Sequence, residues 1–480
     1  MPSELKKKTA KGMLWSAVER FSTQGIQFLF GIILARLLTP ADYGVIAMLT
    51  IFLAISQTFI DSGFSNAVIR KIDRTEQDMA TMFFFNIGMS IVCYAVIFLA
   101  SPFIASFYKM PELTLILRVL ALKLILQSFA SIQITKLTIN IDFKKQAKIS
   151  LTAALLSGVV GIGFAYMGYG VWSLVIQALF STAFSSLLYW VVVRWHPQCF
   201  FNKESFKNLF AYGSKLLASA LMDTTMKNIY PLIIGKFYTP AQLGGYSNAE
   251  KFSQFPSSNL TAILQRVSFP VLSSLQKEPE RLRNNYLKFL NLSTFLIFPL
   301  MIGLLALAKP LTLLLLTEKW SGMILLLQIL CLAMLWYPVH AINLNMLQVL
   351  GRSDLFLKLE IIKQIISVGI LCGTLPFGIT VLCLGKVLDT WLALIINTYY
   401  SGKLMKAGFF VQMRFIFPTF LNSLVMGALV LGVNTLLPEN NHLLQIGTGI
   451  ATGVLYYLLS AFLFNRDALN ELIQIFKKKR

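Results

Sequence analysis

The sequence predicts an all-α polytopic membrane protein with about fourteen transmembrane helices and both termini in the cytoplasm. Composition, the spacing of apolar runs and the distribution of positive charge support this prediction. The 480 residues are 56% hydrophobic and only 13% charged, and the mean hydropathy is +0.68, which is far more apolar than a soluble protein. Strand-like alternation is absent from the sequence, and lipid offers no partner for unpaired backbone groups, so we expect the spans to be helices.

Apolar runs of roughly 20 residues, long enough to cross the hydrocarbon core as helices, recur along the whole chain. The predicted spans are 10–38, 40–69, 79–107, 113–137, 148–167, 170–194, 206–238, 240–272, 286–308, 321–349, 355–375, 378–402, 413–437 and 442–464. The basic cluster at 6–8 is followed by a helix that carries Glu19 and Arg20, and no small-residue cleavage site follows it. We therefore expect the first span to remain in the mature protein rather than to act as a signal peptide.

Positive charge is distributed unevenly between the two sides of this predicted topology. Of the 42 lysines and arginines, 28 fall on one set of tails and connections and five on the other. Cytoplasmic loops carry the excess of Lys and Arg, so the rich side, with both termini, is predicted to be cytoplasmic. The net charge of +21 then reflects topology. Because the basic residues form no contiguous soluble domain, no nucleic-acid partner is expected.

Two stretches of the chain repeat each other at an offset of two hundred residues. Residues 31–44 read GIILARLLTPADYG and residues 231–244 read PLIIGKFYTPAQLG. Thr at the N-cap, Pro at the first helical position and Asp or Gln at N3 predict a capping box in each copy. The residues concerned are Thr39, Pro40 and Asp42 in the first copy and Thr239, Pro240 and Gln242 in the second.

The repeat predicts how the helices are grouped. Six spans, an even number, separate the two copies, so both copies point the same way through the membrane. This is a parallel repeat, and it predicts two six-helix lobes related by an axis along the membrane normal, plus two extra helices. The predicted domains are 1–200 with spans 1–6, 201–408 with spans 7–12, and 409–480 with spans 13–14 and a basic cytoplasmic tail.

The first helix of each predicted lobe carries a polar stripe in matching register. The stripe of span 7 recurs every four residues, at Lys215, Ser219, Asp223 and Lys227. Span 1 has Glu19, Thr23 and Gln27 at the same offset, with Arg20 and Gln24 beside them. An ionisable residue inside a span costs at least about 2.5–3.5 kcal/mol, so these stripes predict a wet interior between the lobes.

The stretches LARLLTPADYGVIAM and FIDSGFSNAVIRK, together with the fourteen-span layout, resemble the Wzx-type polysaccharide flippases. These belong to the multidrug/oligosaccharidyl-lipid/polysaccharide exporter superfamily. The resemblance implies a V-shaped pair of lobes that uses alternating access to move an undecaprenyl-pyrophosphate-linked oligosaccharide from the cytoplasmic to the outer leaflet. Capsule, exopolysaccharide or O-antigen lipopolysaccharide would be the product. It further implies a bacterial inner-membrane protein whose partners are lipid-linked oligosaccharide, membrane lipids and polysaccharide polymerase machinery.

A sugar–pyrophosphate headgroup cannot enter hydrocarbon, so this function requires a hydrophilic, cationic cavity. Arg and Lys bind phosphate, and Arg can do so through two hydrogen bonds. The candidate contacts are Arg20, Gln24, Gln27, Lys123, Lys215 and Lys227. Lys123 is followed at four-residue spacing by Gln127 and Ser131. The competing interpretation of Arg20 and Lys227 is an intramembrane ion pair with the nearby Glu19 or Asp223.

Acidic residues within the spans are candidates for coupling transport to an ion. They are Glu19, Asp61, Asp223, Glu250 and Asp389. Glu250 precedes a polar stretch with Pro256, which is predicted to break span 8. Lys386 and Asp389, three residues apart, are an equally good candidate for a structural pair.

Two other functions remain open at this stage. A multidrug or cation antiporter of the same superfamily should carry acidic residues that Arg or Lys does not compensate, whereas intramembrane cations here are at least as numerous as anions. A membrane-embedded glycan polymerase or ligase would need catalytic groups on the outer face, where the predicted connections are short. The sequence shows no metal-like Cys or His spacing, no nucleophile–His–Asp set and no glycine-rich phosphate loop. We therefore expect no metal, no catalytic residues and no cofactor.

Overall fold

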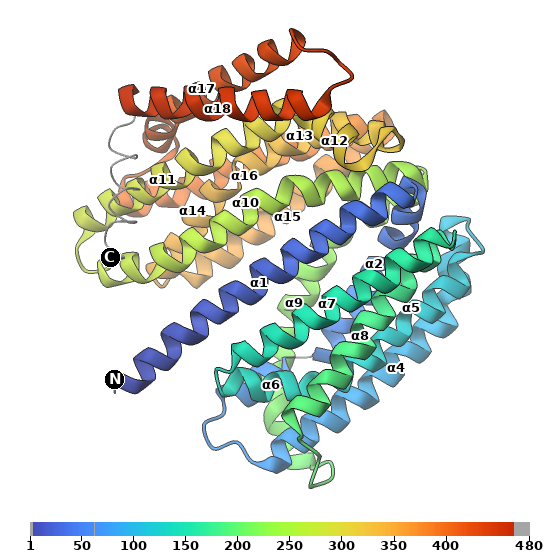
Figure 1. The fold of residues 1–480 in the computed structure, drawn as a ribbon. Coiled ribbons are helices and arrows are strands. Elements are labelled where there is room, and N and C mark those ends of the chain that lie inside the picture. The colour runs from blue at the N-terminus through green and yellow to red at the C-terminus, as the bar shows by residue number, and fades with distance from the viewer. Residues whose placement is uncertain (1–2, 62, 465–480) are drawn as a thin grey trace. The chain divides into compact units, whose positions relative to one another are not determined.

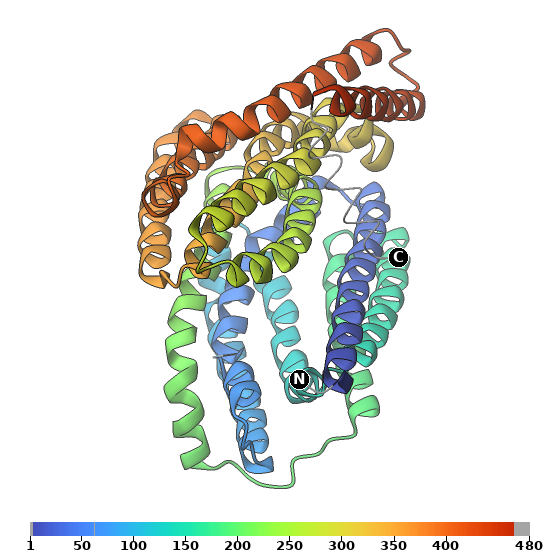
Figure 2. The same ribbon diagram turned by 90° about the vertical axis from the view of Figure 1, so that its left-hand side faces the viewer.

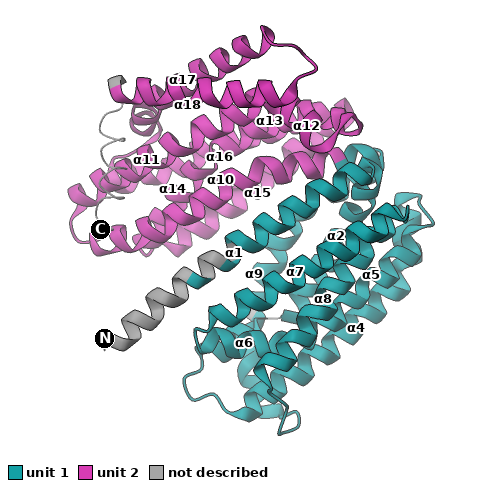
Figure 3. Cartoon of the chain, in the orientation of Figure 1, with its two compact units in different colours: residues 1–244 teal, residues 245–480 magenta. Residues whose placement is uncertain are grey.

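The computed structural model describes residues 3–61 and 63–464, excluding the side chains of residues 3–14, 16–18, 20, 215, 463 and 464. Across these residues the regular structure is helical. The chain divides into two compact units, residues 1–244 and 245–480, which Figure 3 distinguishes by colour. These units are defined by contacts, whereas the predicted lobes are defined by the repeat. The lobe boundaries therefore stay a prediction.

The first unit is built from nine helices and the start of a tenth. They are α1 (Ser3–Leu37), α2 (Pro40–Asp61), α3 (Phe64–Arg70), α4 (Glu76–Tyr108), α5 (Leu113–Ser128), α6 (Ser131–Ile139), α7 (Phe143–Tyr166), α8 (Val171–Val193) and α9 (Lys203–Phe237). Helix α1 packs along α7, α4 along α5 and α9 along α2 (Figure 1). Figure 2 shows the extended connection 194–202, which crosses the lower end of this unit from α8 to α9.

The second unit contains most of α10 and the helices that follow. They are α10 (Pro240–Ser274), α11 (Pro279–Ala306), α12 (Ala308–Leu316), α13 (Ile324–Leu335), α14 (Tyr337–Val349), α15 (Ser353–Thr374), α16 (Ile379–Met405), α17 (Phe409–Thr435) and α18 (His442–Phe464). Short 3₁₀ helices, Glu318–Met323 and Leu375–Phe377, precede α13 and α16. Helix α11 packs on α17, α15 on α16 and α17 on α18.

A helix or a run of short helices lies over each of the fourteen predicted ranges. Within the described residues, nine helices are long and apolar enough to cross a membrane, or ten if α5 and α6 form one bent span. Helices α9, α10 and α15 fall outside this set because they carry more polar and charged residues. The chain is thus a multi-pass membrane protein. The full count of fourteen and the cytoplasmic termini stay predictions.

Three predicted spans are interrupted at places that the sequence analysis missed, and one of them is span 10, which divides at Trp336 into α13 and α14. Span 2 divides into α2 and α3, with Gly63 at φ 71°, a left-handed conformation that suits glycine. Span 4 divides into α5 and α6, which are bent by 41°. The predicted break of span 8 at Pro256 is wrong, because α10 continues through this residue to Ser274. A proline removes one backbone donor and kinks a helix without necessarily ending it.

Candidate functional site

The two repeated corners adopt the same local structure, as the sequence predicts. In the first corner the Thr39 amide donates to Asp42 Oδ2 at 2.8 Å, and the Asp42 amide donates to Thr39 Oγ1 at 3.4 Å. In the second, the Thr239 amide donates to Gln242 Oε1 at 3.1 Å, and the Gln242 amide to Thr239 Oγ1 at 3.3 Å. Both predicted capping boxes are confirmed, and α2 and α10 each begin at the expected proline.

The two corners also touch each other through their backbones within the first unit. A Cβ atom added to Gly44 would lie 1.8 Å from the Pro240 carbonyl oxygen, and one added to Gly244 would lie 1.8 Å from the Pro40 carbonyl oxygen. Both positions therefore require glycine. The contact is reciprocal, which is the pattern that a rotational relation between two copies produces.

A polar cavity of about 250 Å³ lies in the first unit, between the α2/α3 and α5/α6 interruptions. Its polar lining includes Gln57, Asp61, Gln127, Ser131, Thr135 and Thr138. Asp61 Oδ1 accepts a hydrogen bond from Gln57 Nε2 at 3.1 Å. Among the described residues that line the cavity, Asp61 is the one ionisable group. The structure thus brings the predicted coupling residue Asp61 together with Gln127, which follows Lys123 on α5.

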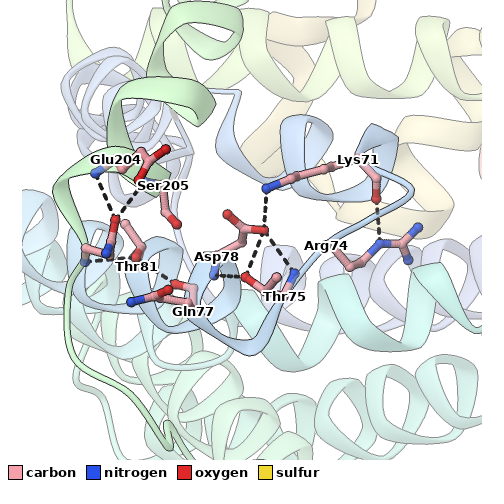
Figure 4. A network of polar contacts seen from close by, with 9 residues as sticks. Lys71, Arg74, Thr75, Gln77, Asp78, Thr81, Glu204 and Ser205 are labelled. Carbon is pink, nitrogen blue, oxygen red and sulfur yellow. Dashed lines mark hydrogen bonds and ion pairs between the residues drawn. The ribbon is translucent and has the colours of Figure 1, made fainter.

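A network of polar contacts ties α3, α4 and the connection to α9 together (Figure 4). Lys71 Nζ lies 2.8 Å from Asp78 Oδ2, which also accepts the Thr75 amide at 2.9 Å in the capping box of α4. The hydrogen bond to Asp78 raises the pKa of Lys71 above its usual value. The Asn202 amide donates to Thr81 Oγ1 at 3.1 Å. These bonds fix the first turn of α4 against the segment that leads into α9.

In the second unit, Glu250 on α10 pairs with Lys386 on α16. Lys386 Nζ donates to Glu250 Oε1 and, at 2.8 Å, to the Tyr246 hydroxyl, which in turn donates to Glu250 at 3.2 Å. The Glu250 and Lys386 side chains are 20% and 16% exposed. Lys386 thus reaches across to a carboxylate on another helix, and its alternative pairing with Asp389 stays a prediction. Glu250 thereby has a structural partner, and its role in ion coupling stays a prediction.

Four helices of the second unit meet at a buried amide network centred on Asn343, which is 1% exposed. Asn343 Oδ1 accepts from Tyr286 Oη at 2.8 Å, from Ser401 Oγ at 2.7 Å and from Gln412 Nε2 at 3.1 Å. Asn343 Nδ2 donates to Gln412 Oε1 at 2.9 Å. Buried polar groups are stable only when paired, so this network fixes how α11, α14, α16 and α17 pack.

The second unit also contains an apolar groove of about 460 Å³ between α11, α12, α17 and α18. Its walls are leucine, isoleucine, valine and aromatic side chains, with glycines at Gly303, Gly449 and Gly453. A Cβ atom on Gly303 would meet only the end of a methionine side chain, at 3.8 Å. The missing side chains keep space open between these helices, and an alkyl chain is the kind of ligand that such a surface accepts.

Two predicted site residues on the polar stripe of span 7 bind each other. Lys227 Nζ lies 2.6 Å from Asp223 Oδ2, and the side chains are 71% and 61% exposed. This is the ion pair considered as the competing interpretation of Lys227. On span 1, Glu19 accepts a hydrogen bond from Ser150 Oγ on α7 at 3.2 Å, which ties α1 to α7.

The remaining predicted site residues take no part in the contacts described above. Gln24 is half-buried and Gln27 exposed on α1, Lys123 is half-buried on α5, and Asp389 is half-buried on α16. The side chains of Arg20 and Lys215 lie outside the described residues. Sequence reasoning missed Gln57, Thr135 and Thr138. The four-residue spacing from Lys123 through Gln127 to Ser131 continues to Thr135. This spacing was the sequence signal that could have identified Thr135.

Comparison with known families identifies the chain. The model of the family described as "Polysaccharide biosynthesis protein" matches residues 33–325, more than half of the sequence. The chain belongs to this family. The match covers both repeated corners and the cavity of the first unit.

Similar proteins are named for the biosynthesis of polysaccharides or glycans, and the names of two of them include transport or flippase. The chain is 22% identical to the succinoglycan biosynthesis transport protein ExoT of Rhizobium meliloti (strain 1021), over 100% of this chain and 98% of that protein. It is 25% identical to the lipopolysaccharide biosynthesis protein WzxC of Escherichia coli (strain K12), over 83% and 80%. It is 24% identical to the probable low-salt glycan biosynthesis flippase Agl15 of Haloferax volcanii, over 72% and 73%.

Solved structures show the same fold. The lipid II flippase MurJ in an inward closed conformation matches with a TM-score of 0.76 at 13% identity, over 95% of this chain and all of that one. An inward-facing multidrug resistance MATE transporter of the MOP superfamily matches with a TM-score of 0.63 at 15% identity, over 82% and 98%. At these identities the likeness concerns the fold. This member of the polysaccharide biosynthesis family thus has the fold of membrane flippases and transporters.

Proposed function

We propose that this protein is a flippase that moves an undecaprenyl-pyrophosphate-linked oligosaccharide from the cytoplasmic to the outer leaflet of a bacterial inner membrane. The observation that carries the proposal is the family match over residues 33–325. The fold shared with a lipid II flippase supports it. The exported glycan would feed capsule, exopolysaccharide or O-antigen assembly, with polysaccharide polymerase machinery as the downstream partner.

A lipid-linked sugar presents the protein with two incompatible surfaces, a charged headgroup and an alkyl tail. We assign the tail to the apolar groove between α11, α12, α17 and α18, which has space for a hydrocarbon chain. Helices α17 and α18 are the two extra helices of the predicted repeat, so they are free to serve the tail while the repeated helices serve the headgroup. Lipid hydrocarbon is as apolar as this groove, so the groove contributes van der Waals packing to the alkyl chain rather than a hydrophobic transfer free energy.

The headgroup is assigned to the polar stripes. Arg20, Lys123, Lys215 and Lys227 remain the proposed pyrophosphate contacts. The exposed pair of Lys227 with Asp223 is compatible with this role, because an exposed ion pair contributes only about 0–1 kcal/mol. A pyrophosphate, with more charge than one carboxylate, can displace Asp223 from the ammonium group.

Alternating access requires a closure that opens, and the paired corners supply a candidate. In the proposed topology the corners lie on the outer face, and to their close backbone contact at Gly44 and Gly244 we assign the closing of the path. Separation of the corners would open the protein to the outside. The two capping boxes keep each corner rigid, so the corners would move as units rather than unfold.

A drug or organic-cation antiporter is the second candidate, and the size of the Asp61 cavity argues against it. Pockets for drug-sized ligands usually measure about 300–1,000 Å³. The cavity that Asp61 lines measures about 250 Å³, which suits a small ion or water better than an organic cation.

The test is deletion of the gene, followed by analysis of lipid-linked glycans in inside-out membrane vesicles. The proposal expects the complete glycan lipid to accumulate in the cytoplasmic leaflet, where enzymes added to inside-out vesicles reach it. Normal exposure on the outer leaflet together with unpolymerised product would support a polymerase or ligase instead. Unchanged glycans with increased sensitivity to cationic drugs would support the antiporter.

A further inference from the structure

We propose that the cavity between the two helix interruptions of the first unit is a binding site for a sodium ion. One wall comes from the end of α2, through Gln57 and Asp61, and from α3, through Ser65 and Ile69. The other comes from the end of α5 and from α6, through Gln127, Ser131 and Thr135. Interrupted helices are where transporters expose backbone and side-chain oxygens to coupling ions.

The hydroxyl groups of α6 are oriented as cation ligands. Thr135 Oγ1 donates its proton to the Ser131 carbonyl at 2.9 Å, and Thr138 Oγ1 donates to the Ile134 carbonyl at 2.9 Å. Ser131 Oγ likewise donates to the Ser128 carbonyl at 2.8 Å. A hydroxyl whose single proton is committed to its own helix offers only oxygen lone pairs to a ligand. Ser131 Oγ already accepts a hydrogen bond from Asn86 Nδ2 at 3.1 Å and Thr138 Oγ1 accepts one from Gln146 Nε2 at 3.0 Å, so each keeps one further lone pair. The wall presents these remaining lone pairs as acceptors, which favour a cation over an anion.

The amide of Gln57 adds a further acceptor. Its nitrogen donates to Asp61 Oδ1, and its oxygen is buried without a hydrogen-bond partner among the described residues. A buried oxygen without a partner costs about 1–3 kcal/mol. A cation held between Gln57 and Asp61 would remove this cost.

The charge of the site selects a monovalent ion. Asp61 is the one ionisable group among the described lining residues, so a single positive charge neutralises the cavity. Calcium sites usually combine several carboxylates, and magnesium keeps several waters in octahedral geometry. Lys123, one turn before Gln127 on α5, does not line the cavity. Sodium accepts neutral hydroxyl and amide oxygens together with one carboxylate.

Sodium binding is a property of the folded protein, whereas its use in transport rests on the proposed function. Sodium is held at higher concentration outside cells, so its inward movement through this site can drive export of the lipid-linked glycan. Potassium, with the opposite gradient, cannot drive export by antiport.

The binding test uses the purified full-length protein in detergent, with thermal unfolding followed by intrinsic fluorescence. Sodium chloride replaces choline chloride at constant ionic strength, and potassium chloride is measured in parallel. A ligand that binds the folded state raises Tm in a saturable manner. We expect a saturable rise with sodium and at least about tenfold weaker binding of potassium. No rise with sodium, or an equal rise with potassium, would overturn the proposal.

Variants locate the site. Asp61→Asn should weaken sodium binding at least about tenfold, since it removes the one charge. Thr135→Val keeps the carboxylate and removes one neutral ligand, so a smaller loss is expected even if Asp61→Asn does not fold. Asp354→Asn is the matched control, because this aspartate is exposed and pairs with Arg352 outside the cavity. Sodium binding unchanged in both cavity variants, or lost equally in the control, would overturn the assignment.

A transport measurement separates this inference from the proposed function. Proteoliposomes with and without an inward sodium gradient are compared for flipping of lipid-linked oligosaccharide. Flipping accelerated by the gradient in the wild type, and not in Asp61→Asn, is expected. Flipping that ignores sodium overturns the coupling and leaves the flippase intact. Saturable sodium binding without any flipping retains the ion site and rejects the flippase.

Discussion

Replacement of Gly44 by alanine tests the contact between the two repeated corners. The new Cβ atom would lie 1.8 Å from the Pro240 carbonyl oxygen, whereas real Cβ contacts essentially never fall below 3.0 Å. The corners must therefore move apart locally by about 1.2 Å, which is the difference between these two distances. The obstructing atom belongs to the backbone, so a change of side-chain rotamer cannot relieve the overlap.

Overpacking of this kind usually costs about 1–3 kcal/mol. We expect Gly44→Ala to lower Tm in detergent and to shift the protein toward separated corners. Gly31→Ala on α1 is the matched control, because a Cβ there meets nothing within 4 Å. An alanine inside a helix is favoured over glycine by up to about 1 kcal/mol, so the control should be neutral or slightly stabilising. The two glycine-to-alanine changes should thus have opposite signs.

Thermal unfolding measures the stability change, and labelling measures the separation. A cysteine placed at Ala241, an exposed residue of the second corner, should react faster with a membrane-impermeant maleimide added from outside when Gly44 is alanine. Equal Tm values for the two alanine variants, with unchanged labelling, would refute the idea that the corners form a tight closure.

Three further predictions concern the second unit. Asn343→Leu should destabilise the protein by about 2–3 kcal/mol, because it leaves buried polar groups on three helices without their hydrogen-bond partner. A Tm equal to that of the wild type would contradict this. Glu250→Gln or Lys386→Gln alone should lower the free energy of unfolding by about 2–3 kcal/mol at this partial burial. In a double-mutant cycle the double variant should lose less than the sum of the two single losses. Additive losses would argue against the pair. Gly303→Phe should fill the apolar groove and slow flipping at least about tenfold. Gly447→Phe is the control and should leave the flipping rate unchanged, because a Cβ at this position meets nothing within 4 Å. Equal effects of the two variants on the flipping rate would show that the groove takes no part in the mechanism.

Local sequence signals predicted the local structure well. Thr39 and Thr239 begin capping boxes because four successive residues, from the N-cap to N3, suffice to specify them. The Asp223–Lys227 pair was also visible, since residues four apart share a helix face. The apolar runs gave the helix positions, because an apolar run of span length imposes a helix in lipid.

Features that depend on distant segments were not predictable in the same way. Glu250 and Lys386 are 136 residues apart, and no periodicity links them. The cavity joins Asp61 to α6 only because two interruptions face each other, and the α5/α6 interruption carries neither Gly nor Pro to mark it. Pro256, the stronger sequence signal, lies within a continuous helix. Packing, rather than local propensity, decided where the helices end.

The central claim is that this protein moves a lipid-linked oligosaccharide across a bilayer, and reconstitution tests it most directly. Purified protein is placed in liposomes that contain a fluorescently labelled undecaprenyl-pyrophosphate oligosaccharide, and a membrane-impermeant reagent that destroys the fluorophore irreversibly is added outside. Protein-free liposomes should lose about half of the fluorescence, which corresponds to the outer leaflet. The account predicts that liposomes with the protein lose nearly all of it, and lose less with Gly303→Phe. Loss of fluorescence that stops at the protein-free level would contradict the account.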